Sequence, residues 1–291
     1  MDRRTFLRRA GLGSAGVAAV AAPVGTYALG HHLGATQLDG NYQQSVRAGH
    51  QRGAVNVWWS VTTDERVLAL TFDDGPTKQF SNEVMDVLDR YHVPATFFLI
   101  GKLVEKYPDH VARMIADGHE IANHTYDHYS AATQSIDEVR RTVELGADAV
   151  ASVLGDRPRW FRPVKGHITG TLLSAAASIG HDVAMWSVSR DPGIGTEIDD
   201  MVGVRTNYVD SVHEGAIVIF HDGIGRSGFD LTGPDADLML ARRTEIDALP
   251  DVVERYLEEG YRFVTTSQLI DGFGRFETDD PGAGDDGGGD L

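Results

Sequence analysis

Short apolar segments alternate with amphipathic segments over most of the chain. Short apolar runs are typical of buried β-strands, and apolar residues that recur every three or four positions are typical of helices. On this basis we predict strands at residues 67–72, 96–100, 119–123, 160–161, 183–188, 216–220 and 262–265. We predict helices at residues 82–91, 109–117, 136–154, 171–179 and 245–259.

The repetition of strand and helix predicts an α/β fold with a parallel sheet covered by helices, either open or closed into a barrel. The 291 residues are enough for one large domain with a full hydrophobic core. In both forms of the sheet, the residues that carry out chemistry collect at the carboxyl ends of the strands. Polar clusters that directly follow an apolar run are therefore the first candidates for a functional site.

The N-terminus has the pattern of an export signal. Paired arginines at Arg3 and Arg4 precede a mildly apolar stretch rich in alanine and glycine. This is the twin-arginine pattern, and residues 19–21 offer a small-residue cleavage site. A basic amphipathic helix or an uncleaved anchor is the alternative. From the twin-arginine pattern we expect an exported protein, extracellular or at the cell surface. No later segment is apolar over a membrane-spanning length, so we expect no stable membrane span in the mature protein.

We expect the chain to divide into four regions. They are a twin-arginine signal peptide at 1–30, a linker or N-terminal extension at 31–65, a single catalytic domain at 66–275 and a tail at 276–291. The linker could hold one strand within residues 55–59. The tail consists largely of aspartate and glycine, which bury no apolar surface, and we expect it to be disordered.

The composition excludes several kinds of partner and site. The formal net charge is -17, and a surface this acidic repels nucleic-acid phosphates, so we expect no nucleic-acid partner. The chain has no cysteine, which excludes disulfides, thiolate nucleophiles and cysteine-bound zinc. Any metal must therefore be held by histidine or carboxylate side chains. Nothing in the sequence indicates an oligomeric state.

Polar clusters follow two of the predicted strands in a pattern that suits a metal. Asp73 and Asp74 come directly after the first strand and are followed by a Gly-Pro turn. Such a sequence is also a common turn. His124 and His128 are four residues apart, a separation that places two imidazoles on one face of a helical turn, although such pairs also occur by chance on surfaces. Together with Asp74 they would form a His₂-carboxylate set with open positions for water and substrate.

Three further clusters place ionisable groups after apolar runs. They contain Arg162, Asp191 and His221 respectively. Each of these alone could be a structural ion pair. Five polar clusters in succession, all at the ends of predicted strands, favour an active site.

In their order along the chain these clusters resemble the polysaccharide deacetylases of carbohydrate esterase family 4, which share the NodB homology domain. The resemblance runs from about residue 67 to residue 269. It rests on residues 71–76 (TFDDGP), the pair His124-Thr125-x-x-His128, Arg162-Pro163, Asp191 and Ile219-x-His221. It implies a distorted (β/α) barrel with about seven parallel strands.

The resemblance implies a role for each residue of the first three clusters. Asp74, His124 and His128 bind a divalent metal, usually Zn²⁺. Asp73 is the general base that takes a proton from the attacking water, and Arg162 pairs with Asp73 and holds it ionised. These roles suit amide hydrolysis, which needs a strong nucleophile near neutral pH.

The resemblance also implies the acid side of the reaction. His221 is the general acid that protonates the leaving amine, and Asp191 pairs with His221 and keeps it cationic. Lys165 and Tyr126 belong to the substrate and oxyanion side of the site. In the family the backbone N–H of an aromatic residue points at the oxyanion, and Lys165 occupies that position here.

Two departures from the family pattern affect the expected substrate groove. The third motif usually reads Arg-Pro-Pro-aromatic-Gly, whereas residues 162–166 read Arg-Pro-Val-Lys-Gly. The fourth motif is one residue short at Asp191, with no aromatic after it.

From the polar clusters and the resemblance together, we expect a metal-dependent enzyme that removes N-acetyl groups from N-acetylglucosamine-type units of a polysaccharide or cell-surface glycan. An O-acetyl esterase, or a glycan-binding barrel with impaired catalysis, remains the alternative.

Overall fold

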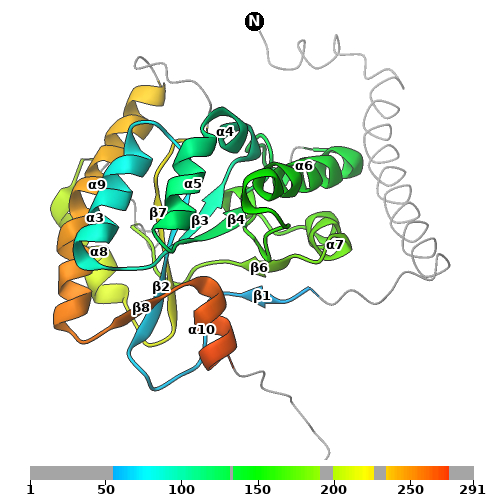
Figure 1. Ribbon diagram of the computed structural model, residues 1–291. Coiled ribbons are helices and arrows are strands. Elements are labelled where there is room, and N and C mark those ends of the chain that lie inside the picture. The colour runs from blue at the N-terminus through cyan, green and yellow to red at the C-terminus, as the bar shows by residue number, and fades with distance from the viewer. Residues whose placement is uncertain (1–54, 132–133, 191–198, 226–233, 275–291) are drawn as a thin grey trace, which may run out of the picture. The chain divides into compact units, whose positions relative to one another are not determined.

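The computed structural model of the chain describes residues 55–131, 134–190, 199–225 and 234–274 (Figure 1). The predicted export signal, the acidic tail and Asp191 lie outside the described residues. Within the described part, no helix is long and apolar enough to cross a membrane.

The strands pair side by side in parallel and form one sheet with the order β1-β6-β5-β4-β3-β2-β7, while β8 pairs with β2. Their bounds are β1 Val57–Trp58, β2 Val67–Asp73, β3 Thr96–Leu99, β4 Glu120–Asn123, β5 Trp160–Phe161, β6 Asp182–Ala184, β7 Ala216–His221 and β8 Arg262–Val264. The strand expected within residues 55–59 is present as β1. Each predicted strand has a counterpart, and the parallel α/β architecture is confirmed.

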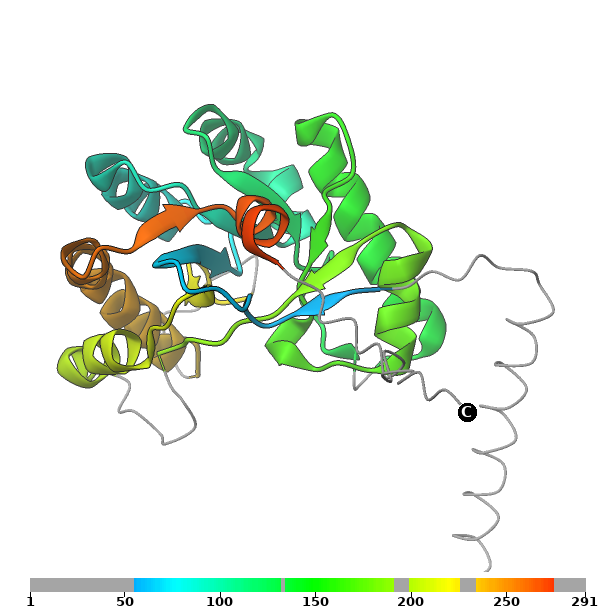
Figure 2. The ribbon, with the colours of Figure 1, turned by 90° about the horizontal axis from the view of Figure 1, so that it is seen from below.

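The sheet curves so that its two ends approach each other, which produces the expected distorted barrel (Figure 2). Beyond β6 the chain leaves β5 and bridges to β7 at the opposite end of the sheet, where Val188 pairs with Val218. The amide of Ile219 donates to the carbonyl of Val188 at 2.9 Å. This crossing explains why β6 is shorter than the apolar run 183–188 suggested.

Helices surround the strands (Figures 1 and 2). Their bounds are α3 Phe80–Tyr91, α4 Gly101–Lys106, α5 Pro108–Ala116, α6 Ile136–Leu154, α7 Gly170–Ser178, α8 Met201–Ser211, α9 Pro234–Glu258 and α10 Thr266–Phe273, with the short 3-10 turn η2 at Val164–Gly166. Local sequence fixes several ends. Helix α6 begins at a capping box formed by Ser135 and Glu138 and ends at Gly155, whose φ of 89° only glycine adopts easily.

Among the helices that the structure describes, α4, α8 and α10 have no counterpart in the helices expected from the sequence. The sequence does not predict helix α8 because its apolar residues lie on both the buried and the exposed side of the helix: Val204 and Tyr208 are buried, whereas Val202 is exposed. Helix α9 starts at Pro234, well before the predicted start at Glu245. The residues between Pro234 and Glu245 group an apolar run, 238–241, between charged residues, and this grouping does not repeat every three or four positions as the apolar face of a helix does.

Strand β2 lies at the centre of the fold and carries the first candidate cluster. All seven of its residues are buried. One edge of β2 pairs with β7, and the other pairs first with β8 and then with β3. Phe72 stacks on Phe97 with ring centroids 5.1 Å apart and contacts Phe220 at 5.8 Å. This packing holds the carboxyl end of β2 in a fixed position.

Candidate active site

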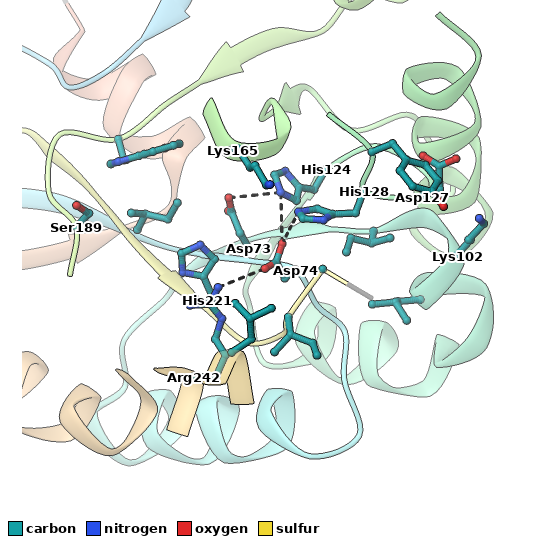
Figure 3. Close-up of a pocket in the computed structure, with 18 of the residues that line it drawn as sticks. Asp73, Asp74, Lys102, His124, Asp127, His128, Lys165, Ser189, His221 and Arg242 are labelled. Carbon is teal, nitrogen blue, oxygen red and sulfur yellow. Dashed lines mark ion pairs between the residues drawn. The ribbon is translucent and has the colours of Figure 1, made fainter. Parts of the chain in front are cut away.

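The candidate residues meet at the carboxyl ends of the strands, as the sheet rule predicts. Asp73 ends β2 and is paired in register with His221, the last residue of β7. His124 directly follows β4. Their side chains border a pocket of about 860 Å³ (Figure 3), which is also lined by Lys165, Trp186 and other residues.

Arg162 anchors Asp73 in the position expected of a base. Its guanidinium is fully buried and donates to the carboxylate Oδ1 of Asp73 at 2.8 Å and to the Thr71 hydroxyl at 2.9 Å. The remaining N–H groups donate to the carbonyls of Ala184 and Met185. A buried charge is tolerated when it is paired and hydrogen-bonded, so this ion pair fixes one oxygen of Asp73 and leaves the other toward the pocket.

Asp74, His124 and His128 form a group that could hold a metal ion, with one ligand atom from each within 4.8 Å of the others. Oδ1 of Asp74 lies 2.9 Å from Nε2 of His128 and 3.6 Å from Nε2 of His124. These contacts are drawn as dashed lines in Figure 3. The donor set of two imidazoles and a carboxylate is one that zinc and similar divalent metals accept.

The surroundings of this group also suit a metal. Nδ1 of His124 donates to the carbonyl of Arg162 at 2.8 Å, which directs Nε2 at the carboxylates. Burial opposes the ionisation of Asp74, but contacts with His124 and His128 outweigh it and lower the pKa of Asp74 well below its usual value. Burial likewise opposes a charge on His124, yet Asp73 and Asp74 outweigh it and raise the pKa of His124. The site therefore stabilises positive charge between these side chains.

The two histidines do not lie on a helical turn, so that part of the sequence interpretation was wrong. Residues 124–128 form an irregular loop, in which Thr125 and His128 have φ of 69° and 59°. The amide of Thr125 donates to the side chain of Asn123, and the amide of His128 donates to the Thr125 hydroxyl. These side chains satisfy backbone groups that a helix would have paired internally, and the loop brings both imidazoles to Asp74.

A tight approach of two loops fixes the position of Asp74. A Cβ atom on Gly223, just after β7, would lie 2.1 Å from the carbonyl oxygen of Asp74. A Cβ on Gly75 would lie 2.3 Å from the carboxylate of Asp222. Asp222 itself is fully buried, and burial raises its pKa to about 7. Glycine is therefore required where the loop after β2 contacts the loop after β7.

His221 has a partner that the sequence did not identify. Its Nδ1 lies 3.2 Å from Oε1 of Glu245, a fully buried residue of α9. The predicted partner, Asp191, lies outside the described residues. The sequence predicts Glu245 only as the first residue of a helix. The signal available in the sequence was weak, because Glu245 stands 24 positions from His221 and in no motif.

A second residue of α9 reaches the metal-ligand group. Arg242 donates to Oε2 of Glu245 at 2.7 Å, and its other terminal nitrogen lies 3.5 Å from Oδ2 of Asp74 (Figure 3). Oδ1 of Asp74 is the oxygen that faces the histidines. Arg242 therefore occupies the far oxygen of the carboxylate and leaves the near one for a metal. No motif in the sequence indicates a role for Arg242.

The two residues predicted for the substrate side differ in position. Lys165 is exposed and lines the pocket, on the 3-10 turn η2 with φ of 57°. Tyr126 is not among the described residues that line the pocket. Its hydroxyl donates to Glu105 at 3.0 Å, and its ring lies against Gly101. Tyr129, three positions later, lines the pocket and is largely exposed.

This arrangement is typical of a class of hydrolytic enzyme: a parallel barrel with a carboxylate paired to an arginine, a group that could hold a metal ion, and a histidine, all at the carboxyl ends of its strands. Comparison with known proteins identifies the family. The family model for polysaccharide deacetylase matches residues 60–184. A peptidoglycan-N-acetylglucosamine deacetylase of Bacillus cereus is 31% identical over 214 residues, which cover 74% of this chain and 92% of that protein.

Two further matches are to proteins of the same family. The peptidoglycan-N-acetylmuramic acid deacetylase PdaC of Bacillus subtilis is 29% identical over 72% of this chain, and the match spans 40% of that longer protein. A crystal structure of a peptidoglycan N-acetylglucosamine deacetylase superimposes with a TM-score of 0.63 at 28% identity, covering 75% of this chain and 95% of that one. The chain belongs to the polysaccharide deacetylase family, whose members are hydrolases that act on amide bonds.

Proposed function

We propose that this protein removes N-acetyl groups from N-acetylglucosamine-type units of a polysaccharide or cell-envelope glycan, with a divalent metal held by Asp74, His124 and His128. The observation that supports this most strongly is the placement of Asp73 and His221. They stand side by side on β2 and β7 and border the same pocket as the metal-ligand group. An amide hydrolase needs such a base and acid on either side of the scissile bond.

The base side of the reaction belongs to Asp73. Arg162 donates to Oδ1 of Asp73 at 2.8 Å and so fixes that oxygen in place. Oδ2 is then available to take one proton from a water molecule as its oxygen attacks the acetyl carbonyl carbon. When bound, a divalent metal would polarise that carbonyl and lower the pKa of water to about 7.

The acid side belongs to His221. As the bond between the carbonyl carbon and nitrogen breaks, its electron pair goes to the nitrogen, which takes a proton from His221. The products are acetate and the free amine of the glycan. The amine is a poor leaving group unless it is protonated, so the presence of His221 in the same pocket as Asp73 is essential to the proposed reaction. Exchange with solvent restores both groups.

The experiment that tests the proposed function is an acetate-release assay on a panel of acetylated glycans. N-acetylated chitooligosaccharides and peptidoglycan test the amide reaction, and acetylated xylan tests the ester reaction. We expect release from at least one N-acetylated glycan. Release from xylan alone would assign the protein as an O-acetyl esterase, and binding of glycan without any release would assign an inactive barrel.

Lys165 provides a prediction about the altered third motif. We propose that its backbone N–H contributes to stabilising the oxyanion, a role that does not depend on the side chain. Lys165→Ala should therefore keep turnover nearly unchanged and act mainly on substrate affinity. Lys165→Pro removes the N–H and should lower turnover by roughly 10²- to 10³-fold. The readout is kcat and KM for an N-acetylated oligosaccharide.

Proline also restricts Val164, so the Lys165→Pro protein must be shown to be folded and metal-loaded. If Lys165→Ala proves as damaging to turnover as Lys165→Pro, the ammonium group itself acts in the reaction or on an acidic glycan, and the backbone assignment is wrong.

We also propose that the protein is exported by the twin-arginine route and acts outside the cytoplasm. The support is the paired arginines of the N-terminus and relatives named for peptidoglycan. Replacing Arg3 and Arg4 together by lysine should retain the precursor inside the cell, as measured by fractionation and immunoblotting. Export of the double variant at the normal level would rule out this route.

A further inference from the structure

The strongest unassigned feature of the site is the buried contact between His221 and helix α9. Glu245 is fully buried, although it carries an acidic side chain. Three polar contacts surround its carboxylate. Oε1 accepts from the Tyr208 hydroxyl at 2.7 Å and lies 3.2 Å from Nδ1 of His221, and Oε2 accepts from Arg242 at 2.7 Å. The hydroxyl of Tyr208 is also within 2.8 Å of the carbonyl of Ile219 on β7.

These contacts determine the charge of Glu245. Burial opposes its ionisation, but the charges of His221 and Arg242 and the hydrogen bonds from His221 and Tyr208 outweigh this and lower its pKa to about 2. An ionised carboxylate only accepts hydrogen bonds. The contact with His221 therefore requires a hydrogen on Nδ1, which leaves Nε2 as the atom that exchanges a proton in the pocket.

Rigid neighbours hold this carboxylate in place. Tyr208 is on α8, Arg242 and Glu245 are on α9, and both helices pack together beside β7. The ring of Tyr208 stacks on Phe220, with centroids 4.0 Å apart, so the hydroxyl that meets Glu245 is fixed by the core. Neither Glu245 nor Tyr208 lies among the described residues that line the pocket. Glu245 can therefore act on substrate only through its neighbours His221 and Arg242, both of which line the pocket.

We propose that Glu245 is the positioning residue for His221, which holds the imidazole ring with Nε2 free to act in the pocket. This inference rests on the proposed function, in which His221 protonates the leaving amine. It assigns to helix α9 a role in the reaction. Arg242 links the same helix to Asp74, so one buried ion pair supports both the acid and the metal-ligand group.

The test separates positioning from a purely structural role by the choice of leaving group. An N-acetylated oligosaccharide needs a proton on its leaving amine. An aryl acetate such as 4-nitrophenyl acetate releases a phenolate that is stable near neutral pH and needs none. With Glu245→Gln we expect kcat for the amide to fall by about 10²-fold, within the usual contribution of a general acid. Turnover of the aryl ester should change by less than about threefold, and KM for the amide should stay the same.

Matched variants complete the experiment. Glu245→Asp keeps the charge and should restore part of the amide turnover, whereas His221→Ala should reproduce the amide-selective loss. Asp247→Asn is the control on the same helix, because Asp247 is partly exposed and pairs with Arg243 away from the site. It should leave both reactions unchanged. Circular dichroism and metal content should be measured for every variant.

Several outcomes would overturn the inference. An equal loss of amide and ester turnover in folded, metal-loaded Glu245→Gln protein would mean that Glu245 is structural. Normal amide turnover in that variant would mean that His221 needs no partner on α9. An amide-selective loss in Asp191→Asn but not in Glu245→Gln would return the role to Asp191. Failure of the wild-type protein to release acetate from any N-acetylated glycan would instead contradict the proposed function, independently of Glu245.

Discussion

Asp73→Asn should lower the rate of acetate release from an N-acetylated glycan by about 10²- to 10⁴-fold, the usual contribution of a general base. The metal should stay bound, because the proposed ligands are Asp74, His124 and His128, which could hold an ion without Asp73. Asparagine keeps an oxygen that can accept from Arg162, so the hydrogen bond at 2.8 Å can survive while the base is lost. The measurement is kcat with elemental analysis of the same sample.

Asp74→Asn is the matched control for this prediction, since Asp74 is the adjacent residue with the other role. It should lose the metal and the activity together. The Asp73 variant leaves the buried Arg162 without a charged partner, which can cost about 3–5 kcal/mol of stability, so thermal unfolding must show that it remains folded at the assay temperature. If Asp73→Asn loses the metal and Asp74→Asn retains it, the two carboxylates are assigned in the wrong order.

His124→Ala and His128→Ala should each abolish retention of the metal and, with it, detectable deacetylation. Each removes one of three protein ligands, and the remaining two cannot enclose a divalent ion in a tetrahedral set. His124 is the more buried of the two, with its side chain 2% exposed against 16% for His128. The metal content of the dialysed proteins, measured by elemental analysis, provides the test.

His110→Ala is a suitable control for the histidine variants. His110 lies on α5 and contacts Asn82 rather than the candidate site. This variant should bind metal and turn over substrate as the wild-type protein does. Full metal content in both His124→Ala and His128→Ala would show that the metal is bound elsewhere.

The sequence was informative wherever local pattern and local structure coincide. The apolar run of β2 predicts a buried strand, and Asp73 follows from its place at the end of that run. Helix α6 has the bounds 136–154 expected from the sequence, and the structure shows a capping box at its start and a terminal glycine at its end. Such signals depend only on neighbouring residues, so they can be recognised without knowledge of the fold.

The features that the sequence did not reveal depend on contacts between distant segments. Glu245 meets His221 only because α9 packs beside β7, and no local pattern marks a glutamate at the start of a predicted helix. The loop that holds His124 and His128 is another case. Four-residue spacing suggested a helical turn, but Asn123 and Thr125 supply hydrogen bonds that stabilise a loop instead. Tyr126 was assigned to the substrate side, yet its ring packs against Gly101.

Reconstitution of activity by metal tests the central claim most directly. The purified wild-type protein is treated with a chelator, dialysed, and titrated with Zn²⁺ while acetate release from an N-acetylated chitooligosaccharide or peptidoglycan is measured. We expect activity to disappear on chelation and to return in proportion to added metal, reaching its maximum at one ion per chain. Undiminished acetate release from protein shown to be free of metal would contradict the account.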